Sequence, residues 1–133
     1  MKVYVFGNPD VPEDKTSLDV AEVLKENTKE IEFVFVKPNE DLPFANEDWV
    51  VIMDVVRGLK KTELFEIGSM DKLILPPRTS AHDFDLGFQL KYLKKLGKLK
   101  EVQIIGIPYG KNPDYLSIQS ILRKLVAHDM QGS

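Results

Sequence analysis

The chain has 133 residues, of which 43% are hydrophobic and 29% charged, a composition typical of one soluble globular domain. Its net charge of −3 argues against a nucleic-acid-binding protein, which usually carries a basic excess. The absence of cysteine excludes disulfides, thiolate catalysis and thiolate metal sites. No apolar run approaches the roughly 20 residues that cross a bilayer. We therefore expect a single cytoplasmic domain over residues 1–133, with neither a membrane nor a nucleic acid as partner.

The first half of the chain predicts alternating strands and helices. Residues 2–6 are rich in valine and aromatic residues and run into Gly7-Asn8-Pro9, which predicts a buried strand followed by a turn. Residues 14–25 carry apolar side chains at helical spacing, and residues 31–36 predict a second strand. Residues 49–53 are apolar throughout, as is typical of a central strand covered on both faces.

The second half continues this alternation. Residues 62–67 alternate between apolar and polar side chains and predict an edge strand or part of a hairpin, and residues 73–75 predict a short strand. Residues 84–96 and 115–126 have the apolar spacing of amphipathic helices, and residues 102–107 predict a further strand.

Strands that alternate with helices predict a three-layer α/β fold, in which a twisted and mainly parallel sheet is flanked by helices. The interior strands should be those over residues 3–6, 50–53 and 104–107, because these stretches are continuously apolar. Ligands of such sheets collect at the carboxyl ends of the strands. Polar residues at those ends are therefore the candidates for a functional site.

The first candidate is His82, which follows the breaker Pro76-Pro77 and precedes a predicted helix. A histidine at a helix N-terminus, flanked by Asp83 and Asp85, is placed to bind a metal or carry a proton. The alternative is a solvated residue in a loop where one of the aspartates or Ser80 caps the helix.

Two further stretches put carboxylates at strand ends. Asp54 follows an apolar strand, where an ionised carboxylate is costly unless it is paired or bound to a cation. Glu13 and Asp14 follow the first strand; they either stabilise the start of a helix through its dipole or supply a ligand oxygen. Together with His82 they predict a metal site of oxygen and nitrogen ligands, which suits zinc, nickel, iron or manganese.

Other sequence patterns give weaker evidence for a function. A phosphate-binding loop is a poor match to Gly7, since no second glycine or Gly-Lys pair follows and the local charge is negative. A serine hydrolase is disfavoured because the chain has no Gly-x-Ser-x-Gly motif. One group of lysines predicts a solvated helix face or, alternatively, a docking surface for an acidic partner: Lys91, Lys94, Lys95, Lys98 and Lys100.

Taken in order, these segments resemble the maturation endopeptidases of nickel-iron hydrogenases. That family has a strand ending in Gly-Asn, an acidic pair at the first helix, an apolar strand ending in aspartate, a Ser/Thr-rich loop with a histidine, and a late strand ending in Gly-Ile-Pro. The matching stretches here are residues 6–9, Glu13-Asp14, residues 50–54, residues 80–86 and residues 104–108.

The resemblance implies a phosphorylase/hydrolase-like fold and a site that recognises nickel through Asp14, Asp54 and His82. It also implies that the nickel comes with the substrate, the precursor of a hydrogenase large subunit. The enzyme would remove the C-terminal extension of that precursor after nickel insertion. With no cysteine and no activated serine, the attacking group would be water.

This sequence departs from the family where Lys15-Thr16-Ser17 replaces the usual glycines, and where Asp14 stands in place of a more common glutamate. Two alternatives therefore stay open. One is a non-catalytic metal-binding or chaperone-like module that recognises the same precursor, and the other is an unrelated α/β domain that binds a small molecule.

Overall fold

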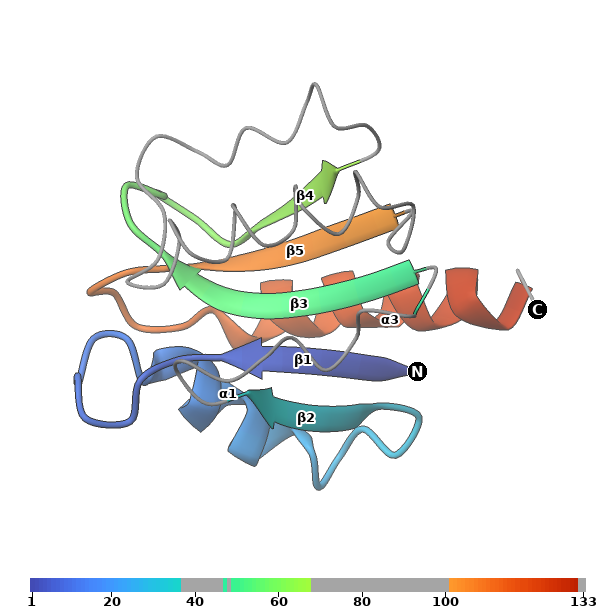
Figure 1. The fold of residues 1–133 in the computed structure, drawn as a ribbon, viewed down its shortest axis with the longest axis horizontal. Coiled ribbons are helices and arrows are strands. Elements are labelled where there is room, and N and C mark those ends of the chain that lie inside the picture. The colour runs from blue at the N-terminus through green and yellow to red at the C-terminus, as the bar shows by residue number, and fades with distance from the viewer. Residues whose placement is uncertain (37–46, 48, 68–100, 132–133) are drawn as a thin grey trace.

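The computed structural model describes residues 1–36, 47, 49–67 and 101–131, which form a sheet with two helices against it (Figure 1). The strands and helices are, in chain order, β1 (Lys2–Phe6), α1 (Thr16–Leu24), β2 (Glu32–Val36), β3 (Trp49–Val56), β4 (Glu63–Ile67), β5 (Glu101–Pro108) and α3 (Tyr115–Gln131).

The five strands lie in the order β2-β1-β3-β5-β4. The pairs β1/β2, β1/β3 and β3/β5 are parallel, and β4 pairs antiparallel with β5 at the edge. The mainly parallel sheet is therefore confirmed, as is the prediction of an edge strand at β4. The three strands predicted to be interior are the three that have a neighbour on each side.

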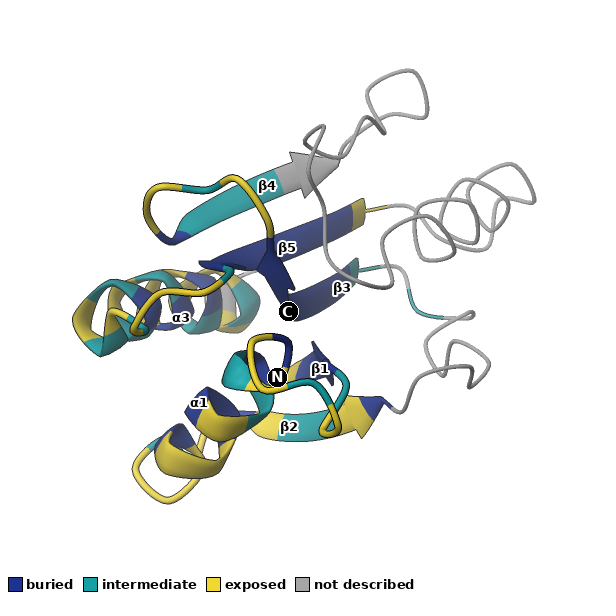
Figure 2. Cartoon of the chain, turned by 90° about the vertical axis from the view of Figure 1, so that its left-hand side faces the viewer, coloured by how far each residue is buried: buried dark blue, intermediate teal, exposed yellow. Residues whose placement is uncertain are grey.

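The helices α1 and α3 lie on the same side of the sheet (Figure 2). They bury the side chains that point towards them from β1, β3 and β5, because alternate residues of a strand face the same way. This core consists of Val3, Val5, Val51, Met53, Ile105 and Ile107 from the strands, with Val20, Ala21, Leu24, Ile118, Leu122 and Leu125 from the helices.

The opposite face of the sheet is also buried. Its core includes Tyr4, Phe6, Val50, Ile52 and Ile104, each at most 6% exposed. Burial raises the pKa of the Tyr4 hydroxyl, and the hydrogen bond of 2.7 Å that it donates to the Glu47 carboxylate raises it further. Because both faces are buried, the sheet is the middle layer of a three-layer α/β fold.

Two boundaries differ from the predictions in ways that affect the site. The helix predicted from Asp14 begins at Thr16, because the N–H groups of Asp14 and Lys15 both donate to the carbonyl of Val11 in a preceding turn. The strand predicted to stop at Met53 continues to Val56, because its last residues pair with β5. Asp54 therefore lies inside β3 and not after it.

Other boundaries shift less. The last helix continues to Gln131, past the predicted end at residue 126, and β5 is one residue longer at each end than predicted. The strand predicted over residues 73–75, the helix predicted over 84–96 and His82 lie outside the described residues. No helix of the described ranges is long and apolar enough to span a membrane.

The Asp114 carboxylate forms hydrogen bonds at the N-terminus of α3 whose contribution to stability can be tested. The Asp114 carboxylate accepts hydrogen bonds from the Ser117 hydroxyl, at 2.8 Å, and from the Ser117 backbone N–H, at 3.2 Å. These two bonds lower the pKa of Asp114 in the folded state. They therefore stabilise the folded state at a pH above the ordinary carboxyl pKa, and this stabilisation is lost as the pH falls through the pKa of the folded state. We expect Asp114→Ala to lower the melting temperature at pH 7, with a difference from wild type that shrinks below a pH of about 4.

Asp114→Asn is the matched control, because its amide oxygen still caps the helix but does not titrate. It should melt between the wild type and Asp114→Ala at neutral pH. Circular dichroism melts over a pH series measure both effects, and a difference for Asp114→Ala that stays constant to low pH would contradict this assignment.

Candidate functional site

The carboxyl ends of β1, β3 and β5 meet at one edge of the sheet, since these three strands are parallel (Figure 1). Three connections leave from this carboxyl edge: residues 7–15, residues 57–62 and residues 109–114. In parallel sheets this is the edge where ligands bind. Two of the three residues predicted to form a metal site are described, and both lie here.

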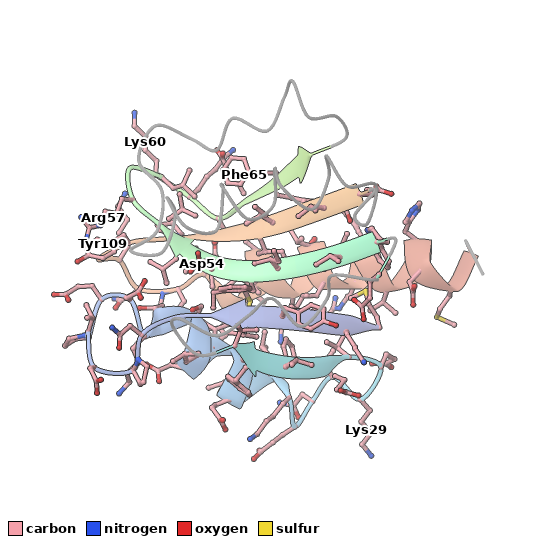
Figure 3. All side chains as sticks on the ribbon, viewed as in Figure 1. Lys29, Asp54, Arg57, Lys60, Phe65 and Tyr109 are labelled. Atoms are coloured by element: carbon pink, nitrogen blue, oxygen red, sulfur yellow. The ribbon has the colours of Figure 1, made fainter. Side chains whose placement is uncertain are left out.

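Asp54 lies on β3, near the end of the sheet where Arg57 and Tyr109 also lie (Figure 3). It is 2% exposed, and its Oδ1 accepts a hydrogen bond of 2.8 Å from the backbone N–H of Val55. By the alternation of the strand, Asp54 faces the same side as Ile52, away from α1 and α3. The sequence predicted this environment for Asp54, a buried position near the end of a strand.

Gly106 on β5 pairs with Asp54 in the strand register. A Cβ at this glycine would lie 2.8 Å from both Leu59 Cδ1 and Phe65 Cε2, so the missing side chain lets these two residues pack against Gly106, the strand partner of Asp54. No role of Gly106 at the site was predicted from the sequence. Its signal was a glycine inside an otherwise apolar strand, which marks a close approach.

Asp14 is fully buried beneath the loop that follows β1. Its Oδ2 accepts a hydrogen bond of 2.8 Å from the backbone N–H of Asn8, and the nearby Ser17 hydroxyl donates to the carbonyl of Phe6. Glu13, by contrast, has an exposed side chain. Of the acidic pair, Asp14 is therefore the residue that is held against the end of β1.

Gly7 makes this close packing possible. A Cβ on Gly7 would lie 2.7 Å from the backbone oxygen of Asp14 and 2.9 Å from the Ser17 hydroxyl oxygen. Only glycine lets the chain pass so near the start of α1 without displacing it. The Gly-Asn motif thus has a steric function as well as supplying the N–H that holds Asp14.

The strand register relates the two aspartates. Val5 of β1 lies opposite Met53 of β3, so the next residue of each strand places Phe6 beside Asp54. The loop that holds Asp14 starts directly after Phe6. The structure therefore brings Asp14 and Asp54 to the same edge from adjacent strands, whereas His82 lies outside the described residues. Within the described ranges, no three His, Asp or Glu side chains form a group that could hold a metal ion.

The chemistry available to these two groups is that of hard oxygen donors. A carboxylate has about four lone-pair directions over its two oxygens, and it can accept N–H donors and bind a cation through different directions. Both aspartates are held by backbone N–H groups on short segments next to the sheet. They can bind a divalent cation or accept a proton with little reorganisation.

A pocket of about 360 Å³ lies at the other end of the sheet. It is formed by the turn between α1 and β2 and by the C-terminal half of α3. Neither aspartate contributes to it, and its lining is Asn27, Thr28, Glu30, Gln119, Leu122, Arg123, Val126, Ala127 and Met130. We therefore place the candidate site at the carboxyl edge and not in this pocket.

Solved structures share this fold over nearly the whole chain. The nickel-iron hydrogenase maturation protease HybD from Thermococcus kodakarensis is 20% identical, with a TM-score of 0.60 over 95% of this chain and 99% of its own. The hydrogenase maturating endopeptidase HybD from E. coli is 13% identical, with a TM-score of 0.63 over 100% of this chain and 94% of its own. An endopeptidase from Escherichia coli is 17% identical, with a TM-score of 0.60 over 96% of this chain and 91% of its own.

Neither a family model nor a curated protein sequence matches the chain. At these identities the solved structures show a shared fold. The chain therefore has the fold of hydrogenase maturation proteases, as its sequence resemblance to that family implied.

The packing at Gly7 leads to a prediction for the site. Gly7→Ala should destabilise the protein by about 1–3 kcal/mol, because the new methyl group would overlap the Asp14 backbone and must push α1 away from β1. Chemical denaturation measures this loss. Asp10→Ala in the same loop is the control, since the exposed Asp10 side chain can be shortened without a clash, and equal stability of Gly7→Ala and wild type would refute the steric role.

Proposed function

We propose that this chain is a processing endopeptidase of hydrogenase maturation, which removes the C-terminal extension of a nickel-iron hydrogenase large-subunit precursor after nickel insertion. The observation that carries the proposal is the coincidence of two independent features. The fold matches hydrogenase maturation proteases from end to end, and two buried aspartates lie at its carboxyl edge.

The order of the motifs supports the same function. The Gly-Asn turn, the acidic pair and the aspartate of β3 follow one another at the spacing typical of the family, and in the structure they meet at one edge. An unrelated small-molecule-binding domain has no need for two buried carboxyl groups at one edge of the sheet, one on β3 and one in the loop after β1. We therefore prefer the processing enzyme to that alternative.

In this proposal Asp14, Asp54 and His82 recognise the nickel that the precursor carries. The donor set fits a borderline divalent cation, since it combines carboxylate oxygens with one imidazole nitrogen and has no thiolate. Three ligands leave coordination positions for groups of the precursor. In this proposal the nickel arrives with the substrate, and its presence distinguishes a precursor that is ready for cleavage.

The protein groups have two tasks in the reaction. They position the nickel-bearing precursor against the carboxyl edge, and they orient a water molecule towards the scissile carbonyl. Nickel, when bound, would act as a Lewis acid and polarise the scissile carbonyl. The sequence has neither a cysteine nor a Gly-x-Ser-x-Gly motif, so in this proposal the peptide bond is cleaved by water without a covalent intermediate on the protein.

The test is cleavage of the nickel-loaded precursor by purified variants. Asp54→Asn and His82→Ala should abolish processing, because each removes one ligand for the precursor's nickel. Asp54→Asn is chosen because its amide oxygen can still accept the Val55 N–H, so the strand end keeps its hydrogen bond. Gel mobility of the large subunit measures cleavage, and circular dichroism melts verify the fold.

The acidic pair allows a matched comparison. Asp14→Asn should abolish processing, whereas Glu13→Gln should retain it, because the Glu13 side chain points to solvent and Asp14 is the acid held against β1. Full cleavage by a folded Asp14→Asn variant would transfer the role to Glu13. Full cleavage by Asp54→Asn would remove Asp54 from the mechanism.

A non-catalytic module that recognises the same precursor is the second candidate. The observation in its favour is the segment Lys15-Thr16-Ser17, which stands where the family usually has glycines: Ser17 is buried, and its hydroxyl donates to the Phe6 carbonyl. Co-purification with the precursor separates the two functions. Binding without cleavage, under conditions where an authentic maturation protease cleaves, would identify the module.

A further inference from the structure

Four cations lie on the two loops that follow β3 and β5 at the carboxyl edge. Arg57, Lys60 and Lys61 follow β3, and Lys111 follows β5; the side chains of all four are exposed. We call this group the basic rim. Figure 3 shows Arg57 and Lys60 at the same end of the molecule as Asp54.

The two loops of the basic rim are joined to each other. The guanidinium of Arg57 lies 4.6 Å from the centroid of the Tyr109 ring, in a cation–π contact. The backbone N–H of Tyr109 donates to the Val56 carbonyl at 3.1 Å, and Lys111 Nζ lies 3.5 Å from the carbonyl oxygen of Lys60. Arg57 and Lys111 are thus each in contact with the neighbouring loop, which restricts their rotamers.

No carboxylate of the described residues forms an ion pair with the basic rim; an ion pair found elsewhere joins Lys25 to Glu22. Asp114 is near in sequence, but its carboxylate accepts bonds from Ser117. Clustered like charges repel one another and usually alternate with opposite charges on a protein surface. Within the described residues the four cations therefore have no carboxylate partner, and they are exposed to an anion from outside.

The other side of the carboxyl edge has the opposite charge. The loop after β1 exposes Asp10 and Glu13, with Lys15 as the one exposed cation in residues 7–15. Since β3 lies between β1 and β5, Asp54 has the acidic loop on one side and the basic rim on the other. A partner with a matching charge pattern would bind in one orientation only.

We propose that the basic rim is a docking surface for an acidic segment of the protein partner, whose carboxylates pair with Arg57 and the three lysines. This inference rests on the proposed function, in which the partner is the large-subunit precursor. A nucleic acid is disfavoured, because the net charge of −3 and the acidic loop beside the rim repel a polyanionic backbone. Docking here would place a bound protein against Asp54.

The first experiment measures binding without cleavage. The probe is a fluorescent oligoglutamate peptide, followed by anisotropy over a salt series, with oligoglutamine and a single-stranded oligonucleotide as comparison probes. The wild type should bind oligoglutamate in a salt-dependent manner. The double variant Arg57→Glu/Lys60→Glu should bind it at least about tenfold more weakly, because both charges change sign.

The matched control is Lys2→Glu/Lys29→Glu, which changes the net charge equally at two exposed positions away from the rim. Lys29 lies at the opposite end of the molecule from Arg57 (Figure 3). This control should bind oligoglutamate within about twofold of wild type. The neutral pair Arg57→Gln/Lys60→Gln should have an intermediate affinity, and it replaces the reversed pair if melting shows that the latter is unfolded.

Three outcomes would overturn the proposal: no salt-dependent binding of oligoglutamate, equal weakening by the control pair, or tighter binding of the oligonucleotide than of the peptide. The second experiment repeats the series with the nickel-loaded precursor and measures association and cleavage rates. The rim variants should associate at least about tenfold more slowly, since peripheral charges act mainly on the association rate.

The two experiments separate the two proposals. The wild type could bind the peptide through the rim and yet never cleave the precursor. That result would support the docking surface and contradict the proposed protease function. If the folded rim variants associate with the precursor and cleave it at wild-type rates, the result would support the protease function and contradict the docking surface.

Discussion

The parallel pairing of β1, β3 and β5 is the constraint on which the rest of the structure depends. Each of these strands is apolar on both faces, so each must be covered on both sides and must have a strand on either edge. Parallel strands end at the same edge of a sheet. The residues that follow them therefore converge, however far apart they lie in the chain, and the candidate site is a consequence of how the core is buried.

At that edge the protein places carboxyl groups where an unassisted charge would be costly. Asp54 and Asp14 are both buried, and a backbone N–H binds an oxygen of each. Glycines make this arrangement possible, since Gly7 lets α1 approach β1 and Gly106 lets Phe65 and Leu59 pack against β5 at the residue that pairs with Asp54. The site is thus stiff on the strand side, while the charges on the surrounding loops differ from one side of the edge to the other.

Much of the site was visible in the sequence, but not all of it. Asp54 was predicted because a carboxylate after an apolar run contradicts the local pattern, whereas Asp14 was predicted from its acidic pair and the resemblance to the family. That Asp54 lies inside β3 was not predicted, since the strand extends past it only through pairing with Ile107 and Pro108 of β5. The contribution of Gly106 was also missed, because its neighbours Leu59 and Phe65 come from elsewhere in the chain.

The sequence by itself determined the strands and helices of the described residues and the mainly parallel sheet, because apolar periodicity is a local property and burial follows from it. Only the tertiary structure decided the strand order β2-β1-β3-β5-β4, the burial of Asp14 in place of Glu13, and the meeting of Arg57 with Tyr109. These features depend on contacts between segments that are distant in the chain, and no local pattern of residues specifies which distant segments meet.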